Sequence, residues 1–417
     1  MLNERISKLV WSESSAQANA LLESLARESS GGAQSQGAKK ADLPATRSTV
    51  AGVRTIAINV LGSVAYGDEQ SFSSESAKPP PGYKLAYMDT ILALVQNLIP
   101  ATFISTKILT SPVMPPNVQR IGHAVLEFPK HVQTLLSRER ASSRSGQANL
   151  LSTLVAASDA ESKQSKFYLS ESELAGNLFQ FTIAGYDTTA NTMAYAINLL
   201  ATKSEWQDWI QEEIDAVAHA FGNDYEAAFP KLKRCLALML ETLRLYTPIP
   251  HISRETQSAQ TIPNPNGGRD LFVPPNTTIY ISGQGMNVAP DQWGTDAMEF
   301  GPGRWLTGSD EATKAKSANG GKLDEESGII DRARGSFLAW GGGPRVCPGM
   351  KMAQVEFVAV IFTIFKDWKV RPTVFEERGE TEEMAKQRLQ DVLKDSQPAV
   401  TLQMNRPRDA VLTWTRR

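Results

Sequence analysis

Cys347 is surrounded by residue types that suit a reactive sulfur. The segment 340–349 reads Trp-Gly-Gly-Gly-Pro-Arg-Val-Cys-Pro-Gly, with four glycines and two prolines around one thiol. Glycines let the backbone approach a flat ligand closely, and turn amides and the N-terminal end of a following helix stabilise a thiolate. Arg345 adds a cation that can meet a carboxylate. The segment predicts a nest for an anionic sulfur beside a planar anionic cofactor; a buried cysteine in a glycine-rich turn explains it equally well.

A second group of unusual residues lies within an expected long helix, in Ala184-Gly185-Tyr186-Asp187-Thr188-Thr189. Glycine costs about 1 kcal/mol relative to alanine inside a helix, and threonines can bond back to carbonyls one turn earlier and bend the helix. The pattern predicts a local distortion beside a small cavity, where Asp187 and Thr188 relay protons to a bound molecule. The alternative is a kinked packing helix with a satisfied aspartate.

Two charges on one helix face form the third candidate cluster. Glu241 and Arg244 are three residues apart in an otherwise apolar helix, so their side chains lie on the same face. A buried ion pair needs further partners to offset the loss of hydration, and Arg304 is a candidate third member. The commonest alternative is a surface pair that contributes little.

The elements that would position these residues are mostly helices. Apolar periodicity, capping residues and breakers predict a mainly α fold with a minor β part, strands coming late in the chain. Two pairs, Ser170 with Glu173 and Ser204 with Gln207, have the spacing of a capping box. We expect helices over 6–26, 48–64, 84–99, 116–139, 170–203, 204–222, 231–246 and 350–365, strands in 271–283, a hairpin in 399–415, and irregular segments at 29–42, 69–82, 140–148 and 306–335.

Composition excludes several classes of protein. The 417 residues carry a net charge of −2, which argues against nucleic acid as a partner. Two cysteines exclude a disulfide scaffold and a four-thiolate zinc site, and the four histidines have no metal-site spacing. We also expect no signal peptide and no transmembrane segment in this chain.

Taken together, these motifs resemble those of the cytochrome P450 superfamily of haem-thiolate monooxygenases, and of its fungal microsomal members in particular. The cysteine pattern F-x-x-G-x-R-x-C-x-G is matched by Gly343, Arg345, Cys347 and Gly349, with Trp340 in place of phenylalanine. The oxygen-activating motif [AG]-G-x-[DE]-T-[TS] is matched by residues 184–189. The E-x-x-R motif is matched by Glu241 and Arg244, and Arg304 falls on the arginine that follows in family members.

The resemblance implies a cytochrome P450 fold holding haem b, with Cys347 as the axial thiolate of the iron. It implies that Arg345 and Arg254 meet the haem propionates, beside Gly343 and Gly349. Asp187 and Thr188 become the catalytic pair that delivers protons.

Glu241, Arg244 and Arg304 become a structural triad that holds the cysteine region. Cys235, in contrast, is interpreted as a core residue.

The beginning of the chain departs from the family. The segment from Asn3 to Trp11 matches sequence that follows the family's membrane anchor, its N-terminal β and helical region and a W-x-x-x-R pair. About 100 residues of the family pattern are therefore expected to be absent, and we predict one P450 domain over residues 1–417. The resemblance places such enzymes at the surface of the endoplasmic reticulum membrane.

The implied activity is insertion of one oxygen atom from O2 into an apolar small molecule, plausibly in fungal secondary metabolite biosynthesis. A separate NADPH-cytochrome P450 reductase would supply electrons, because the chain has no dinucleotide fingerprint. The alternative is a catalytically inactive, truncated relative that binds haem poorly or not at all. A third alternative, a peroxide-rearranging relative, is disfavoured by the presence of Asp187 and Thr188.

Overall fold

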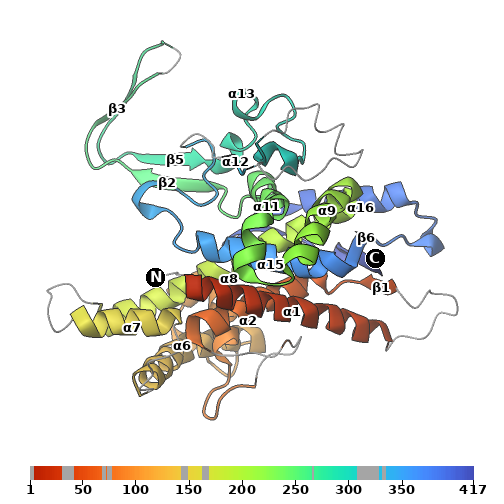
Figure 1. Cartoon of the computed structure of the whole chain (residues 1–417). Coiled ribbons are helices and arrows are strands. Elements are labelled where there is room, and N and C mark those ends of the chain that lie inside the picture. Colours follow the sequence, from red (N-terminus) through yellow and green to blue (C-terminus); the bar gives the residue numbers. More distant parts are fainter. Residues whose placement is uncertain are drawn as a thin grey trace.

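The structure is a computed structural model of the whole chain (Figure 1). It describes residues 4–30, 42–67, 72, 78–141, 149–161, 169–264, 267–307, 328–330 and 335–417. Most of the irregular segments expected at 29–42, 69–82, 140–148 and 306–335 lie outside the described residues.

Long helices make up most of the described chain, as the sequence predicts. The α-helices are α1 (Glu4–Ser30), α2 (Thr49–Tyr66), α3 (Tyr87–Gln96), α4 (Leu98–Phe103), α5 (Thr106–Leu109), α6 (Pro116–Ala141), α7 (Leu150–Glu161), α8 (Glu171–Thr202), α9 (Ser204–Phe221), α10 (Tyr225–Ala228), α11 (Lys233–Leu245), α12 (Gly283–Met286), α13 (Pro290–Trp293), α15 (Met350–Asp367) and α16 (Glu382–Lys394).

The strands form small antiparallel sheets at the margins of the helical body. They are β1 (Asp42–Thr46), β2 (His251–Glu255), β3 (Gln260–Ile262), β4 (Leu271–Val273), β5 (Thr278–Ser282), β6 (Trp368–Pro372), β7 (Ser396–Pro398), β8 (Leu402–Met404) and β9 (Leu412–Arg416). The largest described sheet has the order β1-β9-β6, and the other pairs are β2-β5, β3-β4 and β7-β8. In Figure 1, β2 to β5 lie on one side of the helical body and β1 and β6 on another.

Four helices, α1, α2, α8 and α15, form the centre of the fold. α1 packs against α2 and α15, and α2 packs against α8 (Figure 1). Two glycines permit the close approach: a Cβ at Gly52 would lie 2.3 Å from Leu21 Cδ1, and one at Gly185 would lie 3.1 Å from Leu61 Cδ1. Gly185 therefore has a packing role against α2, which offsets its intrinsic cost inside a helix.

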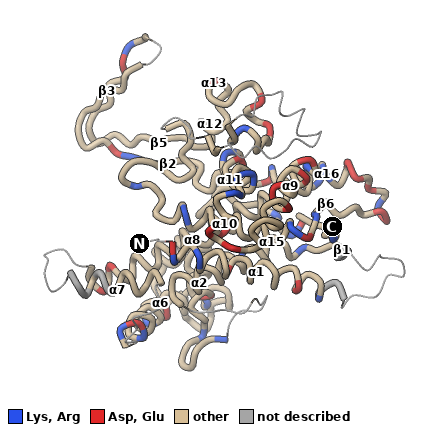
Figure 2. The backbone as a smooth tube through the Cα atoms, in the orientation of Figure 1, with Lys and Arg blue, Asp and Glu red and all other residues tan. Residues whose placement is uncertain are grey.

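Charged residues are sparse in the middle of this centre, as Figure 2 shows for α2 and α8. Within the described residues, α2 is the one helix long and apolar enough to cross a membrane, and 78% of that stretch is buried inside the protein. Its apolar character is accounted for by its neighbours α1 and α8.

The capping box predicted at the start of α8 is present. The Ser170 side chain accepts a hydrogen bond from the Glu173 backbone N–H, and the Glu173 carboxylate accepts one from the Ser170 N–H (2.8 Å). The second predicted box is wrong. Lys203 precedes α9 without a side-chain cap, and Gln207 bonds instead to the backbone of Leu200 and Val370. A tertiary contact with β6 thus replaces the local cap.

The predicted C-terminal hairpin is also wrong in its pairing. β8 pairs with β7, which precedes the expected hairpin, whereas β9 pairs with β6 and β1. Between β8 and β9 the chain passes through a short turn of 3-10 helix, Pro407–Asp409, and leaves one sheet for the other.

Candidate haem-thiolate site

The loop that carries Cys347 is closed by its own backbone. The Cys347 N–H donates to the Trp340 carbonyl oxygen (2.8 Å), and the Val346 N–H donates to the Gly343 carbonyl oxygen (3.1 Å). Gly341 and Gly343 have φ angles of 71° and 66°, a region that favours glycine. The Cys347 side chain is half-buried and is not in a disulfide. The thiol is thus presented from a tight loop just before α15.

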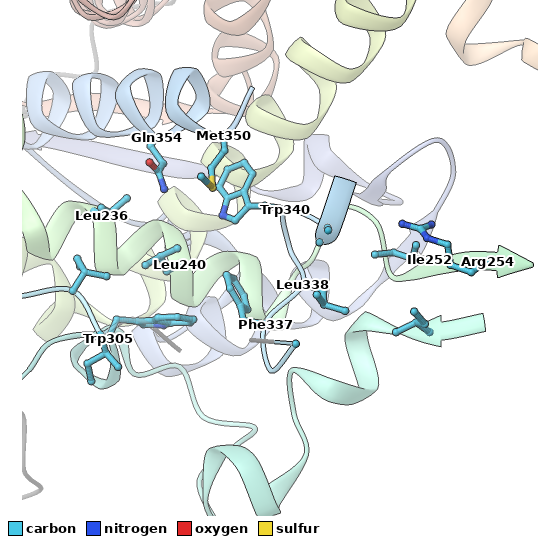
Figure 3. Close-up of a pocket in the computed structure, with 17 residues that line it drawn as sticks. Leu236, Leu240, Ile252, Arg254, Trp305, Phe337, Leu338, Trp340, Met350 and Gln354 are labelled. Atoms are coloured by element: carbon cyan, nitrogen blue, oxygen red, sulfur yellow. The ribbon is translucent and has the colours of Figure 1, made fainter. Parts of the chain in front are cut away.

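An apolar cavity of about 650 Å³ lies beside this loop. Its walls come from α11, β2, β5, the segment 335–343 and the first turns of α15 (Figure 3). Trp340 and Met350 face Leu240 of α11 across it, and Arg254 lies at the end formed by β2. The cavity therefore joins glycine-rich backbone, apolar side chains and one guanidinium.

Two cationic side chains are available near the loop. Arg254 is exposed, and its Nη1 donates to the carbonyl oxygen of Ser253 (2.8 Å). Arg345 is exposed and forms no ion pair with any residue in the described part of the chain. Both guanidiniums can therefore receive carboxylates from outside the protein chain.

The Trp340 indole N–H is a buried donor without a hydrogen-bond partner among the residues that the structure describes. Leaving such a group unpaired costs about 1–3 kcal/mol, so buried donors normally have an acceptor. Trp340 lines the cavity, where a bound molecule with acceptor atoms would satisfy the donor.

The acid and alcohol on α8 differ in their surroundings. Asp187 is only 7% exposed and accepts a hydrogen bond from the Thr401 hydroxyl through Oδ2. Thr188 is half-buried, and its hydroxyl donates to the Ala184 carbonyl oxygen (2.7 Å). The helix remains α-helical through this segment, so the predicted local distortion is wrong: the threonine side chains bond back to carbonyl oxygens without bending the helix out of its α-helical form.

Glu241 is fully buried at the centre of a cluster of hydrogen-bond donors. The Arg244 guanidinium donates to both of its carboxylate oxygens (2.8 Å each), and Arg304 Nε donates to Oε1 (3.1 Å). The backbone N–H of Gly301 donates to Oε1 (2.8 Å) and the Trp305 indole N–H to Oε2 (3.0 Å). Charge-assisted bonds of this kind offset the cost of burying the carboxylate.

The arginines of this cluster also bind backbone. Arg244 donates to the carbonyl oxygens of Asn287 (2.8 Å), Ala297 and Glu299 (2.9 Å), and its guanidinium lies 5.0 Å from the Trp293 ring centre. Burial opposes the charge of Arg304, but Glu241 and Asp296 together raise its pKa. α11 is thereby fastened to the segment 287–305.

Sequence reasoning missed two contributors to these sites. Trp305 binds Glu241 from 64 residues away, and Thr401 binds Asp187 from 214 residues away. Trp305 directly follows Arg304, so the motif that pointed to Arg304 could also have pointed to Trp305. No sequence pattern pointed to Thr401.

The structure brings some of the predicted residues together and not others. Arg254, Trp340 and Gly343 line the cavity, whereas among the described residues neither Cys347 nor the Asp187–Thr188 pair does. α8, which carries the pair, contacts α15, the helix that begins three residues after Cys347. Cys235 is fully buried on α11, and burial raises the pKa of its thiol well above the ordinary value.

Comparison with known proteins identifies the family. The family model for cytochrome P450 matches residues 13–398, and the chain belongs to this family. The chain is 29% identical over 95% of its length to the phomenoic acid biosynthesis cluster cytochrome P450 monooxygenase of Leptosphaeria maculans, covering 68% of that protein. It is 30% identical over 83% of its length to cytochrome P450 monooxygenase 124 of Postia placenta, covering 62% of that protein.

The fold agrees with the sequence comparison. A crystal structure of a cytochrome P450, CYP102L1, superposes with a TM-score of 0.65 at 17% identity, over 99% of this chain and 75% of the other. The mainly α fold predicted from the sequence is therefore confirmed. The chain spans between 62% and 68% of the length of the fungal relatives above.

The family and fold imply haem iron, and the residues fit this group. A half-buried thiol, two exposed guanidiniums and glycines beside an apolar cavity match an iron, two carboxylates and a planar ring. The Trp340 indole N–H, which has no acceptor among the described residues, is a donor that such a group can satisfy.

Proposed function

We propose that the chain carries out the chemistry of a haem-thiolate monooxygenase that inserts one oxygen atom from O2 into an apolar small molecule. The other oxygen atom leaves as water, and two electrons and two protons are consumed. The observation that carries the proposal is the Cys347 loop, in which the thiol is presented by a closed backbone turn next to an unpartnered donor.

In this proposal Cys347 binds the iron of haem b as a thiolate, and Arg345 and Arg254 pair with the haem carboxylates. Gly343 and Gly349 keep space for the group: a Cβ at Gly343 would meet nothing within 4 Å, and one at Gly349 would lie 3.8 Å from the Cys347 Sγ. Haem bound through the Cys347 thiolate would supply O–O bond cleavage, which no side chain of the protein can perform.

Asp187 and Thr188 are the proposed proton-delivering pair. The Thr188 hydroxyl donates its own hydrogen to the Ala184 carbonyl oxygen, so its oxygen lone pairs remain available to accept. Asp187 precedes Thr188 in the same helical turn and is almost entirely removed from water. To deliver a proton, the Thr188 hydroxyl would turn from the Ala184 carbonyl oxygen and give its hydrogen to the bound molecule, and the Asp187 carboxyl, protonated from solvent, would restore it.

The Glu241, Arg244 and Arg304 cluster has a structural role in this proposal. Its bonds connect α11 to the segment that leads into the cysteine loop. Trp305 of this segment and Phe337 pack edge to face with ring centres 4.8 Å apart, and both line the cavity beside Trp340.

A separate NADPH-cytochrome P450 reductase is the proposed electron donor, and an apolar molecule is the proposed substrate. The relative in Leptosphaeria maculans is named for a phomenoic acid biosynthesis cluster, and this supports a role in fungal secondary metabolite biosynthesis.

Labelled dioxygen tests this activity. The chain is loaded with haem and incubated with the reductase, NADPH and a panel of apolar small molecules in unlabelled water. We expect a product with one labelled oxygen atom, and a rate at least about 10-fold lower in Thr188→Val and Asp187→Asn with haem retained. Label-free products, or none from a panel covering polyketides, terpenoids and alkaloids, contradict the proposal.

The proposed location is the surface of the endoplasmic reticulum membrane. The segment from α4 to the start of α6 exposes large apolar side chains, among them Ile99 (73% exposed), Phe103 (83%) and Val113 (86%). Exposed apolar groups gathered on one segment are typical of a surface that contacts protein or lipid.

Binding to vesicles tests this location. We expect the chain to sediment with phosphatidylcholine vesicles, and the double change Ile99→Glu with Phe103→Glu to reduce the bound fraction at least about fivefold. Met298→Glu, at a residue 72% exposed outside this segment, is the matched control and should leave binding unchanged. Equal binding by all variants contradicts the proposed surface.

A further inference from the structure

A chain of hydrogen bonds connects the Asp187 carboxylate to a distant arginine. Thr401 donates to Asp187 Oδ2, and Asn191 Nδ2 donates to the Thr401 hydroxyl (2.9 Å). Arg54 Nη2 donates to Asn191 Oδ1 (3.1 Å) and to Gln403 Oε1 (3.2 Å). The chain thus joins α2, α8 and the β7-β8 turn.

The direction of every bond in this chain is the same. Each donor points toward Asp187, from the guanidinium through the amide and the hydroxyl to the carboxylate. Bonds ordered in one direction polarise one another, so each bond of the chain strengthens the next and the chain holds the Asp187 side chain in one orientation.

The two charges at the ends are unusual for their helices. Arg54 is the one charged residue of α2, and Asp187 is the one charged residue of α8 beyond its first turn. Asn191 is 3% exposed and Thr401 is 3% exposed, whereas Arg54 and Gln403 are half-buried. A buried charge needs compensation, and the cation that compensates Asp187 comes through these two neutral side chains.

Asp187 and Arg54 both act electrostatically on the neighbouring Tyr186 phenol. Burial, and then the Asp187 charge, raise the pKa of Tyr186, while Arg54 opposes this increase. Tyr186 therefore stays neutral, and Arg54 and Asp187 act on the same buried space.

The chemistry of the chain excludes transport of protons along its whole length. A guanidinium and a side-chain amide do not give up a proton to a neighbouring acceptor at neutral pH, whereas a hydroxyl and a carboxyl group can pass one on. Arg54 and Asn191 can therefore hold the inner groups in place without supplying a proton.

We propose that Arg54 is a positioning residue for proton delivery, which acts through Asn191 and Thr401 to hold the Asp187 carboxylate beside Thr188. This inference rests on the proposed function. It adds that the β7-β8 turn, through Thr401, fixes the acid, so that the geometry of this turn and the delivery of protons are coupled.

The test compares Arg54→Met, Asp187→Asn and the double variant in the haem-loaded chain. The readouts are NADPH oxidation with the reductase under O2, measured in H2O and D2O, and the unfolding midpoint in urea. We expect each single change to slow oxidation about 10-fold and to increase the solvent isotope effect, and the double variant to be no slower than Asp187→Asn within twofold. The urea midpoints should also be non-additive.

Conservative and control variants separate positioning from packing. Arg54→Lys keeps the charge and a donor and should recover most of the rate, as Thr401→Ser should relative to Thr401→Val. Arg47→Met is the matched control, because Arg47 is a nearby arginine whose Nη1 donates to the Arg408 carbonyl oxygen and which is outside the chain to Asp187. If Arg54→Met fails to fold, Thr401→Val interrupts the same chain and takes its place.

The possible failures are distinguishable. An unmodified chain that gives no thiolate–haem carbon monoxide spectrum overturns the proposed function, and this inference with it. Two other outcomes overturn the inference alone, in a chain whose carbon monoxide spectrum is that of thiolate-bound haem. One is a double variant whose loss of oxidation rate is the product of the two single losses. The other is an unchanged solvent isotope effect in Arg54→Met.

Discussion

The Glu241 cluster and the Cys347 loop differ in how far protein atoms satisfy their polar groups. Around Glu241 five N–H donors converge on one carboxylate, and the charges are matched by protein atoms. Around Cys347 the Trp340 indole N–H is unpartnered and Arg345 is exposed.

This difference shows which of the two regions needs no ligand to satisfy its polar groups. A saturated buried cluster gains nothing from a ligand and serves to hold segments together. A loop with an unpartnered donor, an exposed cation and a half-buried thiol is complementary to something that the protein does not contain. Both regions meet at the cavity that Trp305 and Trp340 line.

The largest expected effect is a loss of folding stability when the carboxylate of the Glu241 cluster is removed. Glu241→Ala leaves the Arg244 guanidinium buried without its carboxylate, and should lower the free energy of unfolding by about 3–5 kcal/mol. Urea unfolding of the haem-free chain measures this. Glu226→Ala, which removes an exposed pair with Lys8, is the control and should change the free energy of unfolding far less than Glu241→Ala does. A similar small loss at Glu241 would refute the structural reading of the cluster.

The second prediction concerns the pH dependence of stability and a carboxyl group, that of Glu356, which lies in neither of these two regions. Glu356 on α15 is 1% exposed, its Oε1 has no partner, and burial raises its pKa from 4.5 to about 8. The folded state then binds more protons than the unfolded state between these values, so stability falls as pH rises from about 5 to 8, by on the order of 1 kcal/mol per pH unit.

Glu356→Gln should therefore flatten the pH dependence of unfolding over this range and stabilise the chain most at pH 8. Glu213, whose pKa burial raises to about 7, contributes with the same sign and accounts for the slope that remains. Urea midpoints at several pH values measure the difference, and parallel curves for the two proteins would disprove the assignment.

A smaller effect compares two tryptophans. Trp305→Phe removes a bond to Glu241 and should destabilise the haem-free chain by about 1 kcal/mol beyond the loss of packing. Trp340→Phe removes a donor that has no partner, so its cost should be smaller than that of Trp305→Phe. Thermal or urea unfolding decides between them, and the reverse order would show that the Trp340 N–H is satisfied within the protein.

The smallest expected effect on stability is that of Cys347→Ala. The thiol is half-buried and accepts no essential bond, so unfolding of the haem-free chain should change by less than about 1 kcal/mol. A larger loss would assign the cysteine to packing, which is the alternative that the sequence left open.

Much of the helical framework is predictable from the sequence because its signals are local. The α8 helix has a capping box at Ser170 and long apolar periodicity, and both appear in the structure. Gln207 has the same local signal, but its amide is taken by the backbone of Val370 from 163 residues away. Spacing alone does not reveal such competition.

For the site, too, the sequence predicts the residues that belong to local motifs but not the distant residues that contact them. Cys347, Asp187 and Glu241 belong to short motifs, so their types and spacing are visible in the sequence. The partners that complete their surroundings, such as Thr401 for Asp187 and Asn191 with Arg54, are brought together by helix packing and strand pairing. β9 illustrates the limit: its pairing with β6 and β1 could not be distinguished from a local hairpin.

The most direct test of the central claim is the reduced-minus-oxidised carbon monoxide difference spectrum of this chain, expressed with haem supplied. The account predicts a band at about 450 nm that is lost in Cys347→Ala, because the thiolate is the axial ligand. A chain that takes up no haem, or that gives only a band at about 420 nm in both proteins, would contradict the assignment of Cys347 as an iron ligand.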